Sequence, residues 1–372
     1  MSRLALLSSI AVASALLAWP ADKKKKKEEE TQTLELPKEP PAAVIAEAQR
    51  LSFQVAPLSA RGLLSQQVRN GLKWLLTESR GATIIKLRAF VAGSGDMRRV
   101  QAIVSETFTE RRLPLPALSV VQVGSLPLEG AQVALESVAV EKKAVNPNGL
   151  AFLSGQGAAV DQPLEPMLPL VQKSLARLRT AIEAAGLRPD DVLRVTCYLS
   201  SLDDLSAVRQ RVYAEFPRAA LDFVQRMREP SQSLAECEAV ARLRQPPAEP
   251  LVFLNPPGLP GSPDRSEIAL VGPRRLAFTG AQLAFGFRDT DARLAFQRLA
   301  KTLEGVGASY NRVAVLNVYP LSRSIAELVR KVRPEFFDRA RPPAGAMLPF
   351  EGLPSLDASF AVEAIAVLPD SP

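Results

Sequence analysis

The side chains that could do chemistry in this sequence are limited, because histidine is absent from all 372 residues. Without imidazole the chain has no histidine-activated nucleophile, no histidine general base and almost no way to hold zinc or iron. Two cysteines cannot form a replacement cluster, so no metal and no cofactor are expected. Catalysis would have to use carboxylates, arginine, lysine, tyrosine, hydroxyl groups, cysteine or the backbone.

Carboxylates are the candidates that recur along the chain. Three similar strand-like segments each carry one glutamate, and a second strand-like segment ends on an aromatic residue at a near-equal distance upstream. The glutamates are Glu136, Glu238 and Glu363, and the aromatic residues are Phe90, Tyr198 and Tyr319. One spacing found three times indicates an internal repeat.

The elements around these glutamates follow one order of strands and helices in each copy, as hydrophobic periodicity predicts. The first copy predicts helices over 63–76 and 96–108 and strands over 82–91, 119–123 and 131–140. The second predicts strands over 149–156, 191–199 and 234–243, with helices through 171–182 and over 203–216. The third predicts strands over 276–280, 313–319 and 358–367, with helices through 294–303 and over 325–337.

Length and composition place the boundaries of these copies. A chain of this length exceeds one ordinary core, and 47% hydrophobic with 23% charged residues describes a globular protein. We expect a degenerate first domain over 42–143, a second over 144–244, a Pro/Gly-rich connector over 245–266 and a third domain over 267–372.

The N-terminal segment predicts export. Residues 1–21 combine a basic start with a short apolar run and small residues, which is typical of a secretory signal peptide. The alternatives are an uncleaved segment that anchors the protein to a membrane and a buried N-terminal helix. Residues 22–41 are charged and contain proline, which is typical of a tether. The expected location is periplasmic or secreted.

The net charge of +7 does not predict nucleic-acid binding. Part of it belongs to the lysine run at 23–27, and the rest is spread over a large chain without a basic stripe. A solvated surface is the better interpretation, and no nucleic-acid partner is expected.

Cys197 and Cys237 both fall on predicted strands of the second copy. A disulfide would be possible in an exported protein. Two buried thiols, acting as small apolar side chains, are the favoured interpretation.

Short motifs in the second copy, in their order, resemble the reactive-intermediate deaminase family, also called Rid or YjgF and labelled endoribonuclease L-PSP-like. No single motif is specific, but their order is, and poorer versions recur in the other two copies. The matching motifs are Ser154-Gly155-Gln156, Ala184-Ala185-Gly186, Asp190-Asp191-Val192, Tyr213-Ala214-Glu215-Phe216 and Glu238-Ala239-Val240-Ala241.

The resemblance implies an α/β (α+β) fold of chorismate-mutase-like units, each a mixed sheet with two helices on one face. Members usually form homotrimers with substrate clefts between neighbouring units, and they hydrolyse reactive imines and enamines from amino-acid metabolism. Three fused copies therefore imply an intrachain pseudo-trimer, monomeric as a whole, because tethered copies cover each other's apolar sheet faces at high effective concentration.

The resemblance also implies roles for particular residues. The three glutamates would position or activate the attacking water, which a buried carboxylate with a raised pKa can do. A strand-end glutamate paired with lysine or arginine across an interface is the alternative. Substrate-binding positions carried over from the family are Ser154, Gly155, Thr279 and Gly280.

The family arginine that binds the substrate carboxylate has no counterpart in this chain. Its positions hold Leu118, Leu221 and Gly345, none of which can bind an anion. A displaced arginine would have to replace it, and the nearby candidates are Arg226, Arg228, Arg339 and Arg341.

These observations favour an exported protein that binds a small metabolite in interdomain clefts, with weak or altered imine or enamine deaminase activity. One alternative is a catalytically inactive scaffold or partner-binding protein. Another is an active deaminase that uses a displaced arginine. The endoribonuclease activity named in the family label ranks last, because the chain has neither histidine nor a basic stripe.

Overall fold

The computed structural model describes residues 38–93 and 96–369. The predicted signal peptide over 1–21 and most of the predicted tether lie outside the described residues. Within the described ranges, no helix is both long and apolar enough to cross a membrane.

The described strands form three sheets, one for each copy of the repeat. The sheet of the first repeat has the order β2 (Leu51–Val55), β5 (Val133–Val140), β3 (Thr83–Ala92) and β4 (Ala117–Val123). That of the second has the order β10 (Leu251–Leu254), β11 (Ile268–Val271), β6 (Leu150–Val160), β9 (Ser233–Arg242), β7 (Val192–Leu199) and β8 (Ala220–Gln225). That of the third contains β1 (Ala43–Glu47), β12 (Arg275–Thr279), β15 (Ala358–Val367), β13 (Gln282–Phe285) and β14 (Val313–Pro320).

One topology underlies all three sheets. The first strand of each repeat pairs with the closing strand, and the closing strand pairs antiparallel with the middle strand. A late strand then runs parallel to the middle strand, as β4 does beside β3 and β8 beside β7. In the third repeat only isolated parallel bridges at Ala344 and Met347 stand in this place. The internal repeat inferred from spacing is therefore a repeat of topology.

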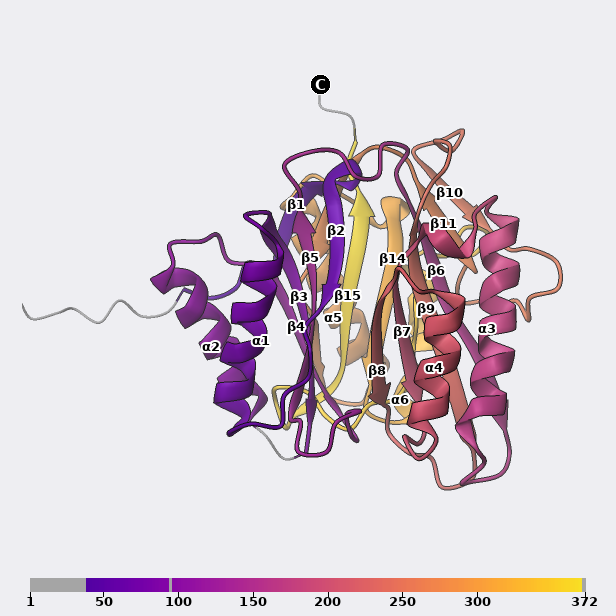
Figure 1. Cartoon of the computed structure of the whole chain (residues 1–372). Coiled ribbons are helices and arrows are strands. Elements are labelled where there is room, and N and C mark those ends of the chain that lie inside the picture. Colours follow the sequence, from indigo (N-terminus) through magenta and orange to yellow (C-terminus); the bar gives the residue numbers. More distant parts are fainter. Residues whose placement is uncertain (1–37, 94–95, 370–372) are drawn as a thin grey trace, which may run out of the picture. The chain divides into compact units, whose positions relative to one another are not determined.

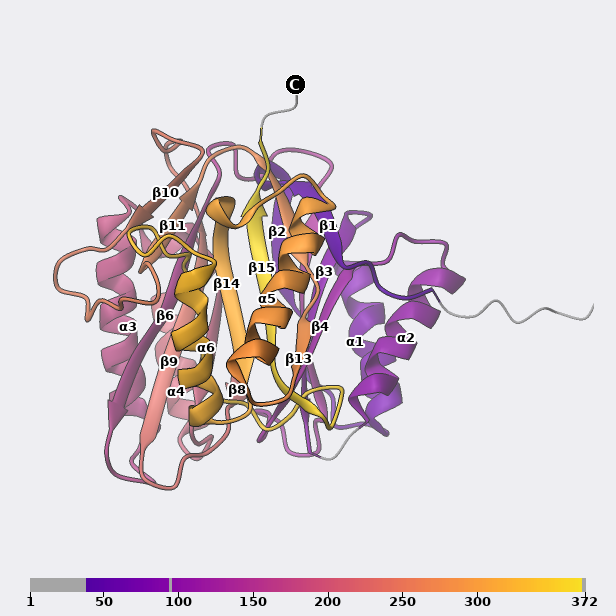
Figure 2. The same cartoon turned by 180° about the vertical axis from the view of Figure 1, so that it is seen from behind.

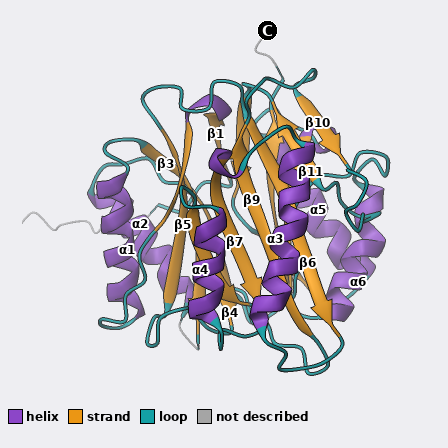
Figure 3. Cartoon of the chain, turned by 45° about the vertical axis from the view of Figure 1, so that its right-hand side comes forward, coloured by secondary structure: helices purple, strands orange, loops and turns teal. Residues whose placement is uncertain are grey.

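Two helices cover the outer face of each sheet, and Figures 1 to 3 show the pairs beside their strands. Four short 3-10 helices join other elements: η1 (Ala48–Arg50), η2 (Pro189–Asp191), η3 (Tyr310–Arg312) and η4 (Arg333–Glu335). The α-helices are α1 (Leu64–Glu78) and α2 (Met97–Glu110), α3 (Met167–Ala184) and α4 (Leu205–Glu215), and α5 (Asp289–Glu304) and α6 (Arg323–Val332).

The predicted helices form because their apolar residues recur on one face. In α1 the side chains of Leu64, Val68, Leu72 and Leu75 are buried against the sheet of the first repeat. The helix predicted over 325–337 is shorter, because α6 ends at Val332 and a 3-10 turn containing a proline follows.

The inner faces of the three sheets share two apolar clusters. One contains Leu51, Phe152 and Phe278, and the other contains Phe90, Tyr198 and Tyr319, so each draws on all three repeats. The described chain is thus a mixed α+β intrachain pseudo-trimer with sheets inside and helices outside. This is the fold class expected from the sequence.

The two cysteines form a disulfide, and the expectation of free thiols was wrong. Cys197 on β7 and Cys237 on β9 are direct cross-strand partners with their Cα atoms 4.1 Å apart. Such a close antiparallel pair is within reach of a disulfide, and this register could not be derived from the spacing in the sequence.

Two strands lie outside the positions that the sequence suggests. β1 belongs to the segment assigned to the first domain, yet it pairs with β12 of the third repeat. The proline-rich connector contains β10, which, together with β11, extends the sheet of the second repeat. The strands β1, β10 and β11, which precede a repeat in the chain, therefore belong to the sheet of a different repeat.

Candidate functional site

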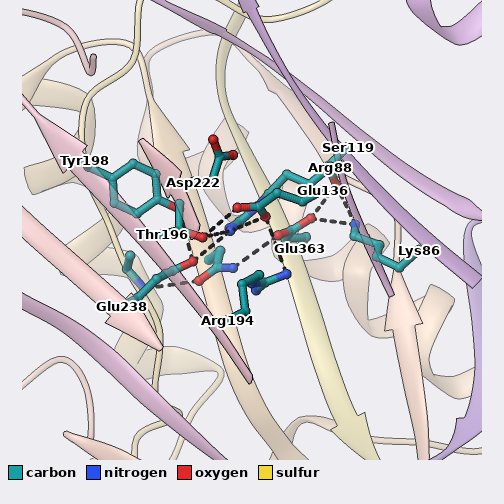
Figure 4. A network of polar contacts seen from close by, with 12 residues as sticks. Lys86, Arg88, Ser119, Glu136, Arg194, Thr196, Tyr198, Asp222, Glu238 and Glu363 are labelled. Atoms are coloured by element: carbon teal, nitrogen blue, oxygen red, sulfur yellow. Dashed lines mark hydrogen bonds and ion pairs between the residues drawn. The ribbon is translucent and has the colours of Figure 1, made fainter. Parts of the chain in front are cut away.

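The three predicted glutamates meet on the inner faces of the sheets, each at the same register. Glu136 is the cross-strand partner of Arg88, Glu238 of Thr196 and Glu363 of Asn317. All three glutamates are buried. Figure 4 shows their carboxylates converging with side chains from all three repeats.

Arg88 joins the glutamates of the first two repeats. Its Nε donates to Glu136 at 2.7 Å, and its Nη2 donates to Glu238 at 2.8 Å. Thr196 of the second repeat donates to Glu136 at 2.6 Å. A third donor, Arg194, lies 3.4 Å from the same carboxylate.

Lys86 forms an ion pair with the glutamate of the third repeat. Its Nζ donates to Glu363 at 2.6 Å, and two further bonds go to Ser119 Oγ and the Thr279 carbonyl, each at 2.7 Å. Ser119 Oγ also donates to Glu363, and Tyr319 donates to the other oxygen of that carboxylate at 2.7 Å.

The electrostatics of these contacts hold Glu136 and Glu363 in their ionised form. Burial alone would raise the pKa of Glu136, but Arg88 and Arg194 bring it below its ordinary value. Burial opposes ionisation of Glu363 too, and Lys86 with Arg88 lowers the pKa of this carboxyl far below its usual range. A water-activating base instead needs a raised pKa and a free oxygen, so the paired arrangement has the stronger geometric support.

A small cavity of about 40 Å³ lies between this charged layer and the apolar cluster that contains Leu51, Phe152 and Phe278. Phe53, Phe152 and Phe278 line it, together with Lys86 and Glu363. A space of this size can hold water but no metabolite.

The three positions of the family arginine are equivalent in register. In the parallel pairings Leu118 is opposite Leu87 and Leu221 is opposite Val195, and the bridge between Val315 and Ala344 puts Gly345 at the matching place. Gly345 has φ +140°, and a Cβ there would lie 2.1 Å from the Leu316 carbonyl oxygen. An arginine cannot occupy that position without a backbone shift.

The cleft between the first and second repeats, the first cleft, measures about 620 Å³. Arg209, Tyr213 and Asp222 supply its polar side chains along with a glutamine of α4. The remaining lining is apolar or backbone and consists of Val55, Ala56, Pro57, Leu58, Pro127, Leu128, Leu221 and Phe223. This volume and composition suit a small organic ligand.

Asp222 is the member of this cleft that approaches the charged layer. Burial and the negative charge of Glu136 raise its pKa to about 8, so it holds a proton at neutral pH. Its Oδ1 accepts from the Phe223 amide at 2.9 Å, and its buried side chain adjoins the Glu136 carboxylate, which can accept its proton. The equivalent position in the first repeat is Ser119, which bonds to Glu363.

The cleft between the third and first repeats, the second cleft, is smaller, at about 240 Å³. Leu118 and Gly280 face each other across it, and a Cβ on Gly280 would lie 2.9 Å from the Leu118 carbonyl oxygen. Residues before β1 fill part of it, since the Gly280 amide donates to the Ala42 carbonyl at 2.8 Å. Thr279 is buried and its hydroxyl accepts from the Ala364 amide.

The cleft between the second and third repeats, the third cleft, is occupied by the connector. Arg265 donates to the Gly155 carbonyl at 2.6 Å, and Ser154 Oγ donates to the Ser266 carbonyl at 2.6 Å. Ser154 Oγ also accepts from the Gly345 amide at 2.9 Å. The two predicted substrate-binding residues of the second repeat are therefore in contact with the chain itself.

None of the four suggested replacement arginines lines the first or second cleft. Arg226 is buried in an ion pair with Glu229, and Arg341 donates to the Leu251 carbonyl at 3.2 Å. The arginine that does line the first cleft is Arg209, which the sequence analysis missed. It directly follows buried Val208 on α4, and no sequence motif distinguishes it from other surface arginines.

Fold and site together define a chain of chorismate-mutase-like units with clefts between them. Residues 142–245 match the family model described as Endoribonuclease L-PSP. The second repeat of this chain therefore belongs to the Rid/YjgF family. Membership supports a small-metabolite-binding or deaminase-type role in general terms.

Solved structures of single-repeat length are similar to parts of this chain. A YjgF family protein from Neisseria meningitidis has 16% identity and a TM-score of 0.25, covering 32% of this chain and 97% of its own. A Rid family protein from Yersinia pestis has 18% identity and a TM-score of 0.29, covering 32% and 100%. A YjgF family member from Mycobacterium tuberculosis has 21% identity and a TM-score of 0.24, covering 32% and 99%. No curated protein matches the sequence.

Proposed function

We propose that this protein binds a small metabolite in the first cleft and has weak or altered imine or enamine hydrolysis. The observation that carries the proposal is the contrast between the clefts: the first is roomy, whereas the connector fills the third. Arg209 is exposed at this cleft and has no ion-pair partner in the described part of the chain. The cleft therefore suits a mainly apolar molecule with one anionic group.

Asp222 is the acidic residue of that cleft, and burial together with the charge of Glu136 keeps it neutral. A neutral carboxyl does not repel an anionic ligand, as an ionised one would. Arg209 for the anion, with apolar walls for the rest of the molecule, fits a 2-oxo acid or its imine. Leu221, where the family arginine would stand, contributes only apolar contact.

Reduced hydrolysis follows from the state of the glutamates. Each carboxylate accepts from charged or hydroxyl donors, and none of the three lines the first cleft. If these carboxylates activated water, Glu238→Gln or Glu363→Gln would abolish hydrolysis. The proposal instead predicts that the wild-type protein itself hydrolyses little.

Two assays on the full chain test the proposal. Pyruvate, the oxo acid released with ammonia when 2-aminoacrylate is hydrolysed, should raise the melting temperature in a saturable manner. Ammonia release from freshly generated 2-aminoacrylate should stay near the rate without protein. Fast release that Glu238→Gln abolishes would instead support an active deaminase. Indifference in both assays would support the scaffold, a role that the occupied glutamates also favour.

Export is part of the proposal. The disulfide between Cys197 and Cys237 supports an oxidising compartment, periplasmic or extracellular, because structural disulfides are rare in the cytosol. The leader-like composition of residues 1–21 points the same way. We also propose a monomer, since three repeats of one chain already cover the inner sheet faces.

A further inference from the structure

The first strand of each repeat has an outer edge, and in two repeats an added strand covers it. β11 pairs antiparallel with β6 along Leu150 to Leu153, as Figure 3 shows for the second repeat. β1 pairs antiparallel with β12 from Arg275 to Thr279. Each added strand comes from the chain segment just before a repeat and covers the first strand of a different repeat.

Sequence and burial identify the third edge. Arg275-Leu276-Ala277-Phe278 on β12 has the same pattern as Arg50-Leu51-Ser52-Phe53 at β2. The leucine and phenylalanine of both stretches lie in one inner apolar cluster. Residues Leu51 to Gln54 are therefore the counterpart of the covered residues Leu276 to Thr279.

The outer edge of β2 is open in the described structure. β2 pairs with β5 alone. The backbone bonds from Glu141 to Arg50 and from Ala56 to Leu135 show that the even-numbered residues of this stretch bond to β5. Leu51, Phe53 and Val55 consequently direct their backbone groups outward. The Leu51 amide donates to the Ala48 carbonyl, and the Leu51 carbonyl accepts from the Asn146 side chain at 2.7 Å. Phe53 and Val55 have no outward backbone bond among the described residues.

A groove of about 500 Å³ runs along all five residues of β2. Its other lining includes Trp74, Leu193 and Ala220, the first residue of β8. β8 is the edge strand of its own sheet, so the groove lies between the sheets of the first and second repeats. An open strand edge in such a groove provides both backbone partners and apolar contact for an extended chain.

The connection between the first two repeats explains the opening. β5 ends at Val140 and β6 begins at Leu150, and the intervening residues form no strand. The amides of Val145 and Asn146 donate to the Gln49 carbonyl in η1, and the Asn146 side chain reaches β2 at the Leu51 carbonyl. The second repeat therefore has no added strand to place on β2, although the first and third repeats each supply one to a neighbour.

We propose that this groove binds an extended aliphatic strand of a partner protein, antiparallel to β2. The occupants of the two equivalent edges define its chemistry: Ala43–Glu47 reads AVIAE and Ile268–Val271 reads IALV. In the first of these pairings Glu47 lies opposite Arg275. Its counterpart Arg50, just before β2, donates its Nε to the Glu141 carbonyl and has Nη1 4.0 Å from Glu47. A short aliphatic strand therefore fits best. This inference does not depend on the metabolite site.

A capped Ala-Val-Ile-Ala-Glu peptide is the probe, added to the full-length protein. We expect saturable binding, measured by calorimetry, and about tenfold slower amide exchange at Phe53 and Val55 when the site is full. The same peptide methylated on the valine nitrogen, which would face the Phe53 carbonyl, should bind about tenfold more weakly or not at all.

Two variants place the peptide on the protein. Ala220→Trp fills the groove and should abolish binding, whereas Ala214→Trp, at an exposed position on α4 outside the groove, should leave it unchanged. No binding at millimolar peptide, or binding without protection of Phe53 and Val55, would overturn the proposal. Protection of these amides that rises with protein concentration and without peptide would overturn it too, because a second copy would then be the occupant.

Discussion

Arg88 and Glu238 are 150 residues apart in sequence, yet Arg88 Nη2 lies 2.8 Å from the Glu238 carboxylate across the boundary between two repeats. The same guanidinium donates to Glu136 of its own repeat. One arginine thus pairs with two buried carboxylates from neighbouring repeats. Divergence of the repeats has turned three equivalent positions, Arg88, Thr196 and Asn317, into one cation and two neutral donors.

Arg88→Met should destabilise the protein by about 3–5 kcal/mol, because it leaves two buried carboxylates without their main partner. Urea denaturation measures the change in the free energy of unfolding. Arg98→Met is the matched control, since Arg98 and Asp96 form an exposed ion pair, and its expected cost is below about 1 kcal/mol. Equal effects of the two substitutions would contradict a structural role for the charged layer.

Asp222→Asn should change the pH dependence of stability. Compared with the wild type, the variant should gain stability at pH 8 relative to pH 5. The pKa of Asp222 is raised to about 8 in the folded state, so the folded chain holds a proton that the unfolded chain has released. Stability from this group is present at low pH and is lost as pH rises, by up to about 1.4 kcal/mol per pH unit.

Unfolding measured across pH 5 to 8 should therefore show a steeper decline for the wild type than for the asparagine variant. The absence of histidine leaves this interval free of imidazole titration. Buried Glu236, whose pKa burial also raises, affects both proteins alike, and the difference between the two curves removes it. Parallel curves would show that Asp222 is ionised in the folded protein.

Replacing both Cys197 and Cys237 by alanine should cost about 3–4 kcal/mol of stability, because the disulfide closes a loop of 40 residues in the unfolded chain. The disulfide lies in the core beneath α3 and α4, so the folded protein should resist reduction. Denaturation with and without reductant measures the effect. An unchanged midpoint after complete reduction would contradict it.

The sequence predicted the repeated sheet-and-helix order because hydrophobic periodicity and the spacing of the glutamates recur three times. It could also align Leu118, Leu221 and Gly345, and strand register brings them to equivalent places. What it could not provide was partners far apart in the chain. Lys86 and Glu363 are 277 residues apart, and no local pattern predicts that they pair.

The clefts were unpredictable for a similar reason. Whether Ser154 faces a ligand or the connector depends on the path of Arg265 and Ser266, which contact the second repeat. Arg209 is one exposed helix residue among many, and only the closure of the first repeat against the second makes it part of a site. The fold of each repeat could be predicted from the sequence, whereas the proposed binding site depends on how the repeats pack against one another.

Calorimetric titration of pyruvate into the wild type, Arg209→Gln and Gln101→Ala tests the proposed function most directly. Gln101 lines the second cleft from α2, as Arg209 lines the first from α4, so it is the matched control. The account predicts saturable binding that Arg209→Gln weakens by about tenfold or more and that Gln101→Ala leaves intact. Binding that survives Arg209→Gln unchanged, or that Gln101→Ala removes, would contradict it.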